Sequence, residues 1–188
     1  MTIMRRLAAA ALAASMSLTA LPALAAKLVI TLKDGDVVIN LRDDLAPKHV
    51  ERIVALAKAG EYDNVAFHRV IDGFMAQTGD VQYGDMEDGY QPSQAGMGGS
   101  KMDDLPAEFT GEAFVEGVVG MARAMDPNSA NSQFFIMLAP APHLNGQYTV
   151  VGQVESGMEH VHAIKKGSTS ANGAVIDPDR MIKVTVKD

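Results

Sequence analysis

The chain has no cysteine, and its 16 Lys and Arg residues are outnumbered by 23 Asp and Glu residues. Without cysteine there are no disulfide bonds, so the fold must be stabilised by packing. A length of 188 residues with 47% hydrophobic content is sufficient for one ordinary domain with a full core. The formal net charge of −7 argues against nucleic acid as a partner. We therefore expect one acidic domain that is stable without disulfides.

Long apolar runs are also missing, except near the N-terminus. Residues 7–21 are almost wholly Ala, Leu, Met and Ser, and they follow Arg5 and Arg6. The small-x-small triplet Ala23-Leu24-Ala25 comes next and is typical of a cleavage site. This pattern predicts a secretory signal peptide over residues 1–25. No later stretch is apolar for long enough to span a bilayer.

Cleavage after Ala25 or Ala26 would leave an exported domain over residues 26–188. An uncleaved membrane anchor is the alternative, but the Ala-rich composition and Pro22 favour cleavage. The segment removed carries two arginines and no acid, so the mature chain would have a charge of −7 − 2 = −9. The style of the signal and the chain length indicate a bacterial periplasm.

Strand-like segments dominate the mature chain. Residues 28–32 and 37–41 are rich in β-branched residues and flank an Asp34-Gly35 turn, which predicts a hairpin. Further strands are expected at residues 67–71, 74–77, 117–124, 132–138, 149–154 and 181–186.

Two amphipathic segments predict helices. One starts at Ala46-Pro47 and stops at Gly60, and the other covers residues 158–166. His49 and Arg52 fall on the polar side of the first helix, and we expect His49 to be solvated. His160 and His162 are two residues apart on the second helix and make a poor metal pair. Since no βαβ rhythm is present, the sequence predicts an all-β-dominated fold, a closed antiparallel barrel capped by two α-helices.

Residues 82–104 show no sustained period and hold repeated Gly, Met and Asp. We interpret them as a long loop that is either functional or mobile. Asp85, Glu87 and Asp88 raise the possibility of a calcium site. Their spacing does not fit an EF-hand loop, which favours a solvated acidic rim.

The stretch from residue 67 to 80 places a cation and an amide among apolar side chains. At strand period, Phe67, Arg69 and Ile71 share one face, and the turn at Asp72-Gly73 brings Gln77 opposite on an antiparallel strand. A guanidinium keeps its charge and offers five donors in a fixed plane. Holding it on an apolar sheet costs desolvation, which indicates a functional use.

With the later segments included, the chain resembles the cyclophilin family of peptidyl-prolyl cis-trans isomerases from about Lys27 to its end. Three motifs carry the resemblance: Phe67-His68-Arg69-Val70-Ile71-x-Gly73-Phe74-Met75-x-Gln77-x-Gly79-Asp80, Gly120-Met121-Ala122-x-Ala124, and Ser132-Gln133-Phe134-Phe135-Ile136. The resemblance implies an eight-stranded antiparallel barrel capped by two helices, with the active groove on its outer face. It also implies no cofactor, and partners that are unfolded or flexible proline-containing polypeptides. No metal is expected, because the histidines lack ligands at a usable spacing.

The resemblance also implies roles for single residues. Arg69 corresponds to the family's catalytic arginine, and Gln77 to the amide that orients it and contacts substrate backbone. Phe67 and Phe134 are expected in the ordinary core, because alternation turns them away from the groove. The implied substrate-binding residues are His68, Phe74, Met75, Met121, Arg123, Ala124, Gln133, Phe135, His143, Leu144 and Tyr148.

Three of these positions depart from better-known relatives. His143 stands where many eukaryotic cyclophilins have a tryptophan, Tyr148 where they often have a histidine, and Arg123 where asparagine is common. The family tryptophan contributes to cyclosporin binding, so we expect weak cyclosporin binding here. Tyr148 can still pack on proline and donate a hydrogen bond. His143 lacks a second ligand at a usable spacing for a metal.

Two other classes of function compete. A peptide-binding module or holdase would keep the groove without catalysis, and the Met- and Gly-rich loop favours it; a buried guanidinium favours an enzyme. Hydrolysis has only scattered candidates, namely Ser129, Ser132, His143 and Asp126, and no Gly-x-Ser-x-Gly motif is present. Nothing in the sequence demands more than a monomer.

Overall fold

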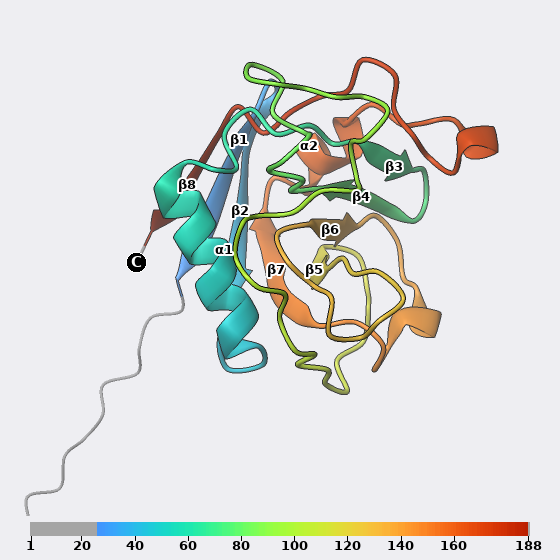
Figure 1. The fold of residues 1–188 in the computed structure, drawn as a ribbon. Helices are drawn as coiled ribbons and strands as arrows, with labels where there is room; N and C mark the ends of the chain where they lie inside the picture. The colour runs from blue at the N-terminus through green and yellow to red at the C-terminus, as the bar shows by residue number, and fades with distance from the viewer. Residues whose placement is uncertain (1–25, 188) are drawn as a thin grey trace, which may run out of the picture.

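A computed structural model describes residues 26–187, so the predicted signal peptide at residues 1–25 lies outside the described residues. Eight antiparallel strands form one curled sheet in the order β3-β4-β6-β5-β7-β2-β1-β8, with helices at its margins (Figure 1). No helix in the described part is long and apolar enough to cross a membrane. The strands are β1 (Lys27–Leu32), β2 (Gly35–Leu41), β3 (Arg69–Ile71), β4 (Met75–Thr78), β5 (Val118–Met121), β6 (Phe134–Met137), β7 (Val150–Ser156) and β8 (Lys183–Lys187).

The first predicted hairpin is confirmed. β1 pairs with β2 in a register that sets Leu32 opposite Gly35, so the turn itself is only Lys33 and Asp34. Several other strands are shorter than the sequence predicts. Residues 67 and 68, for example, precede β3, because their backbone bonds go to a distant segment near the C-terminus instead of to a neighbouring strand.

Strand alternation sorts the apolar side chains onto two faces of the sheet. Phe134 and Ile136 of β6 point into the interior core, where Phe67 is also fully buried, as predicted. The expectation that Phe67 shares a face with Arg69 and Ile71 is wrong, because Phe67 precedes β3 and is outside its alternation. Phe135 and Met137 of the same strand point to the other face and form a second, smaller cluster with residues of β4 and β5. The sheet therefore has a filled interior and an apolar patch on its outer surface.

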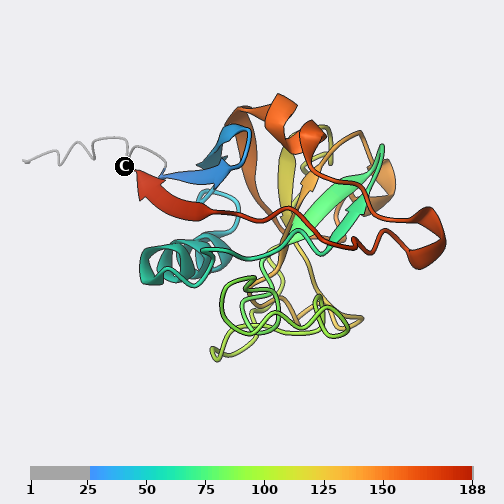
Figure 2. The same ribbon diagram turned by 90° about the horizontal axis from the view of Figure 1, so that it is seen from above.

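The strands do not close the barrel through a continuous ladder of backbone hydrogen bonds. β3 and β8 are the two ends of the pairing order, and they do not pair with each other. The segments that precede them meet through single contacts instead: the Phe67 N–H donates to the Asp179 carbonyl at 2.8 Å, and Ala66 forms an isolated bridge with Arg180. Figure 2 shows the segment between α2 (Met158–Ala163) and β8 running past the β3–β4 hairpin. The described sheet is a curled barrel with an irregular seam.

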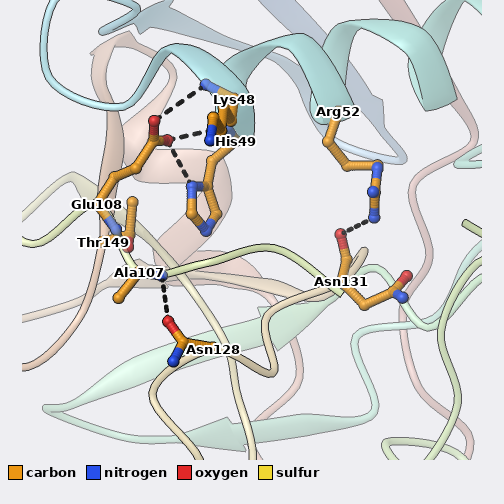
Figure 3. Close-up of polar contacts among 8 residues, drawn as sticks. All are labelled: Lys48, His49, Arg52, Ala107, Glu108, Asn128, Asn131 and Thr149. Carbon is orange, nitrogen blue, oxygen red and sulfur yellow. Dashed lines mark hydrogen bonds and ion pairs between the residues drawn. The ribbon is translucent and has the colours of Figure 1, made fainter. Parts of the chain in front are cut away.

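Helix α1 (Pro47–Ala59) packs against β8 and ends as predicted, at Gly60, which has a left-handed φ of 76°. The expectation that His49 is solvated is wrong, because its side chain is fully buried. Glu108, from a loop some sixty residues later, covers it and accepts a bond from His49 Nδ1 at 2.6 Å (Figure 3). Glu108 also accepts the backbone N–H groups of Lys48 and His49, which replaces the cap that Ala46 cannot provide.

Arg52 is a similar case, since the polar face predicted for α1 would leave it exposed. Its side chain is buried, with Nη2 donating to the Asp103 carbonyl at 2.6 Å and Nη1 to the Asn131 carbonyl at 3.3 Å. Figure 3 shows the His49 side chain pointing toward Glu108 and the Arg52 side chain pointing toward Asn131. Helix α1 therefore buries more than its apolar stripe, because distant loops cover its first two turns.

The predicted loop at residues 82–104 contains no helix or strand. It is organised by Asp80, whose fully buried carboxylate accepts four backbone N–H bonds, two from Gln82 and Tyr83 and two from Gly96 and Gly98. Gly98 in turn accepts a bond from the Gln133 side chain at 2.8 Å. The loop is thus fixed against the sheet at its two ends.

Candidate functional site

One row of residues crosses four neighbouring strands on the outer face of the sheet. Arg69 of β3 lies opposite Gln77 of β4, Gln77 lies opposite Phe135 of β6, and Phe135 lies opposite Gly120 of β5. A Cβ atom at Gly120 would come within 2.6 Å of the Phe135 ring and 2.7 Å of the Phe114 ring. The glycine therefore gives Phe135 the room to lie flat in this row.

Arg69 is held from two sides. Its Nη1 donates to Gln77 Oε1 at 3.2 Å, which confirms that the two residues are neighbours across the hairpin. On the other side, Nε donates to the Asn172 backbone carbonyl at 2.9 Å and Nη2 to Asn172 Oδ1 at 3.1 Å. Asn172 has a left-handed φ of 53°, which asparagine tolerates better than most residues. The guanidinium plane is thereby fixed.

Burial lowers the pKa of the Arg69 guanidinium, but an arginine stays protonated at neutral pH. No ion pair includes Arg69 within residues 26–187; oxygens of neutral amides fix it instead. A second amide bond, from Gln77 Nε2 to Gln133 Oε1 at 3.0 Å, steadies Gln77. The result is an oriented, uncompensated positive charge at the edge of an apolar surface.

An apolar pocket of about 350 Å³ opens beside this charge. Met75, Phe135 and Leu144 are buried and form part of its lining, while Phe74 is half-buried. The pocket is lined by Arg69, Phe74, Met75, Gln77, Ala122, Arg123, Phe135, His143, Leu144 and Tyr148. A cavity of this character accepts a small apolar ring next to a charged donor.

Aromatic contacts hold the pocket walls together. The Phe74 and His143 rings are stacked with centroids 5.8 Å apart, so His143 forms part of the exposed rim. Tyr148 meets Phe135 edge to face at 5.7 Å, and Phe135 stacks on Phe114 at 5.8 Å. These contacts place Tyr148 as the far wall of the pocket.

A second, more polar pocket of about 260 Å³ adjoins the first. The two share Gln77, Ala122 and Arg123, while Ala124 and Gln133 line only the second. Eleven of the thirteen residues implied by the family resemblance therefore line one of two adjoining pockets: nine line the apolar pocket, and Ala124 and Gln133 line only its neighbour.

The other two predicted residues are placed differently. Met121 is buried in the interior core, because alternation along β5 turns it away from the groove, and its neighbour Ala122 lines the pockets instead. His68 is buried beneath Gly96, where a Cβ atom would meet its ring at 2.9 Å, and lines neither pocket. Burial lowers the pKa of His68, so its ring is neutral at pH 7.

Sequence reasoning missed Asn172, which contacts Arg69 directly. The Asn172-Gly173 pair does signal a turn, since both residues suit a left-handed φ. Its contact with a residue about a hundred positions earlier depends on tertiary structure, which that signal does not report. Within residues 26–187, no three His, Asp or Glu side chains gather closely enough to hold a metal ion.

Comparison with known families finds one matching model, described as cyclophilin type peptidyl-prolyl cis-trans isomerase/CLD, over residues 27–186. A probable peptidyl-prolyl cis-trans isomerase of Brucella suis is 61% identical over 159 residues, covering 85% of this chain and 81% of that protein. A peptidyl-prolyl cis-trans isomerase-like 1 protein of Aspergillus oryzae is 34% identical, covering 81% of this chain and 89% of its own length.

Solved structures show the same fold. A cyclophilin from Hirschia baltica superposes with a TM-score of 0.69 at 23% identity, covering 85% of this chain and 73% of that one. A cyclophilin type peptidyl-prolyl cis-trans isomerase from Cryptosporidium parvum, solved in the presence of the dipeptide Ala-Pro, has a TM-score of 0.69 at 25% identity. It covers 86% of this chain and 99% of its own.

Proposed function

The chain belongs to the cyclophilin-type peptidyl-prolyl cis-trans isomerase family and is an isomerase of that type, and we propose that Arg69 is its catalytic residue. The observation that carries the proposal is the fixed guanidinium at the edge of the apolar pocket, held by Gln77 and Asn172. The pocket binds the proline ring, and the guanidinium addresses the bond that rotates.

The chemistry requires no proton transfer and no covalent intermediate. An X-Pro bond isomerises over a barrier of about 18–20 kcal/mol, because the planar amide must lose its resonance. In the twisted state the prolyl nitrogen regains a lone pair that can accept a hydrogen bond. A permanently charged donor at a fixed position favours that state over the planar one. Arg69 fits this role because its charge has no carboxylate partner among the described residues.

Arg69 cannot supply the whole acceleration. Reaching a turnover of roughly 10–10³ s⁻¹ from an uncatalysed time of tens to hundreds of seconds requires about 4–7 kcal/mol. One charge-assisted hydrogen bond contributes about 1.5–3 kcal/mol. We propose that anchoring of the proline by Phe74, Met75, Phe135 and Leu144 provides much of the rest, since only one side of the rotating bond is then free to move.

The Cryptosporidium parvum relative, solved in the presence of Ala-Pro, supports a proline-containing polypeptide as the ligand class. We extend this ligand class to flexible or unfolded exported proteins, because residues 1–25 have the pattern of a signal peptide. The mature chain would have a net charge of −9. The site is therefore proposed to work in the periplasm as an aid to folding, with a monomer as the working form. No metal or cofactor has a part in this proposal.

We also propose that the eight strands and the segments that precede β3 and β8 together form a closed barrel. The single backbone bonds between the segments before β3 and β8, such as that from Met181 N–H to the Val65 carbonyl at 2.9 Å, support a continuous wall. Slow amide hydrogen exchange at Asn64, Phe67 and Met181, whose N–H groups donate across the seam, is expected if the seam stays closed, and exchange at the rate of exposed loops would contradict closure.

A non-catalytic peptide binder or holdase is the second candidate. Met97, which lines the polar pocket, is 73% exposed, and Met125, which follows the pocket residue Ala124 in the chain, is 97% exposed; both would suit capture of apolar segments. The two functions differ in what they require of Arg69. A binder gains little from a half-buried guanidinium, whereas the isomerase depends on it.

The test compares cis-to-trans rates on a short Ala-Pro peptide with the wild-type protein and with Arg69→Ala. We expect clear acceleration by the wild type and a loss of roughly 10- to 100-fold in kcat/KM for the variant, the worth of one charged hydrogen bond. Arg42→Ala is a matched control, because Arg42 pairs with Asp44 and lines neither pocket. No acceleration by the wild type would refute the proposed activity, and full activity of Arg69→Ala would refute the role of Arg69.

A further inference from the structure

Arg123 forms the wall between the two pockets of the groove. It lines both pockets, and its guanidinium carbon lies 4.6 Å from the centre of the Tyr148 ring and 5.8 Å from that of Phe109. A peptide that extends from the apolar pocket into the polar one must pass this guanidinium. Successive residues of an extended chain advance by about 3.3–3.6 Å, so residues next to the proline come within its reach.

The hydrogen bonds of Arg123 are almost complete, but its charge is not compensated. Nε and Nη2 donate to the Gln147 carbonyl at 3.3 and 3.0 Å, and Nη1 donates to the Ala124 and Met125 carbonyls at 2.9 and 3.4 Å. These four bonds leave one of the five N–H groups, on Nη2, for a ligand. No ion pair includes Arg123 within residues 26–187.

The groove is positive although the chain is acidic. Arg69 and Arg123 line the apolar pocket, and neither pocket has an Asp or Glu among the residues that line it. The whole chain, in contrast, has a formal charge of −7. The nearest acid in sequence is Asp126, which is exposed and accepts a bond from the Asn128 N–H at 2.8 Å. A local positive field on an acidic molecule favours a negatively charged ligand at that place.

The loop that presents Arg123 is fixed before any ligand binds. Ser129 Oγ accepts the Ala124 N–H at 2.9 Å and donates to the Asp126 carbonyl at 2.7 Å. Asn128 Oδ1 accepts the Ala107 N–H at 2.9 Å, which ties the loop to the segment that also anchors α1 (Figure 3). A guanidinium already stacked and bonded loses little freedom on binding a carboxylate.

We propose that Arg123 makes this isomerase select proline segments that carry an acidic side chain within two residues of the proline. The inference rests on the proposed function of the groove and adds the class of substrate that it prefers. The carboxylate of the peptide accepts from Nη2 of Arg123 while the proline occupies the apolar pocket.

The experiment measures kcat/KM on a set of peptides with a single X-Pro bond, in which Glu, Gln or Lys stands at one of the two positions before or after the proline and Ala stands at the others. For at least one position we expect the wild type to prefer Glu over Gln by about 2- to 5-fold, as for a partly exposed ion pair, and Gln over Lys. Raising the salt concentration should reduce the preference for Glu, because salt screens a solvent-exposed ion pair between Arg123 and the peptide carboxylate.

Variants of Arg123 distinguish recognition of the peptide's charge from a purely structural role of this residue. Arg123→Gln should bring the Glu-to-Gln ratio to about one, whereas Arg123→Lys should keep the preference for Glu, since it keeps the charge. Arg42→Gln makes the same change in net charge away from the groove and should leave the ratio unchanged. If Arg123→Gln lowers all rates in proportion and preserves the ratio, Arg123 is only structural and the inference is wrong.

The two levels of the proposal fail differently. If no peptide is accelerated by the wild type, the proposed isomerase site itself is wrong. If all peptides are accelerated equally, whatever the charge beside the proline, the isomerase site stands and the selection of acidic segments is refuted.

Discussion

At the residue scale, the site depends on how the Arg69 side chain is held. A free arginine samples many rotamers, but here a side-chain amide and a turn residue accept bonds from three of its nitrogens. Gln77 was expected from the hairpin pattern, and Asn172 was not. Strand pairing is a local regularity that a sequence displays, whereas the approach of a turn from a distant part of the chain is not.

Replacing Asn172 by glycine tests its share in positioning. Gly keeps the left-handed φ and the backbone carbonyl but removes Oδ1, so we expect kcat to fall about 2- to 10-fold with little change in KM, as for the loss of one hydrogen bond. Asn172→Asp keeps an oxygen at that place but gives the guanidinium a carboxylate partner, so we expect it to lose more of the rate than Asn172→Gly. Equal losses in both variants, or a change confined to KM, would contradict a positioning role.

His143 is the residue through which cyclosporin sensitivity can be tested. The side chain stacks on Phe74 at the exposed rim of the pocket, where many relatives have a tryptophan. We expect weak inhibition of the wild type, and tighter inhibition of His143→Trp because the larger ring buries more apolar area. Inhibition titrations of both proteins measure this. Tight inhibition of the wild type, or no gain in the variant, would contradict the interpretation.

At the element scale, period-two alternation was a better guide than helix periodicity, although it wrongly put Phe67, which precedes β3, on the same face as Arg69. Alternation correctly assigned Phe134 to the interior core, and it places Phe135 on the groove face, as the family resemblance implies. The pattern of α1 failed for His49 and Arg52, because loops from residues 103–108 and 131 cover what would otherwise be its polar face. Strands reveal their buried side locally, while a helix can be covered on more than one side by later segments.

The covered histidines make stability depend on pH. Burial lowers the pKa of His49, despite the neighbouring Glu108, and also that of His68, both from an ordinary value of 6.5. The unfolded chain therefore binds protons at a pH where the folded chain does not. Stability is fully present above about pH 6.5 and is lost as the pH falls from there through the lowered folded pKa values.

Urea unfolding at pH 7.5 and 5.5 measures this dependence. We expect a smaller free energy of unfolding at pH 5.5, and a smaller difference between the two pH values for His49→Gln than for the wild type. The Glu108 carboxylate does not contribute to the difference between these two pH values. Burial alone would raise its pKa, but hydrogen bonds from His49 and Lys48 outweigh burial and lower the pKa from its ordinary value of 4.5. A free energy of unfolding that is constant or rises on acidification would contradict this account.

At the scale of the whole molecule, the strand content, the two helices and the groove were predictable from the sequence. The contacts between the two edges of the curled sheet were not. A closed ladder was expected, but the seam between the segments before β3 and β8 is irregular, with isolated bridges. Residues 173–181 show little strand pattern in the sequence. Their bonds to residues 65–70 depend on the curvature of the entire sheet.

The proposed export also concerns the whole chain. Expression of all 188 residues in a Gram-negative host should give a periplasmic protein whose N-terminus, read by sequencing, is Ala26 or Lys27. Replacing Ala23 and Ala25 by bulky residues should block processing at that site. A protein that keeps Met1 and stays in the cytoplasmic fraction would contradict the proposed location.

The most direct test of the account separates binding from rotation on one peptide. NMR titration gives the dissociation constant of an Ala-Pro peptide, and exchange spectroscopy gives its cis-trans rate at saturating enzyme. The account predicts that Arg69→Ala binds the peptide within about threefold of the wild type but loses most of the catalysed exchange, because the Arg69 bond strengthens only in the twisted state. A variant that binds much more weakly yet exchanges bound peptide at the wild-type rate would contradict it.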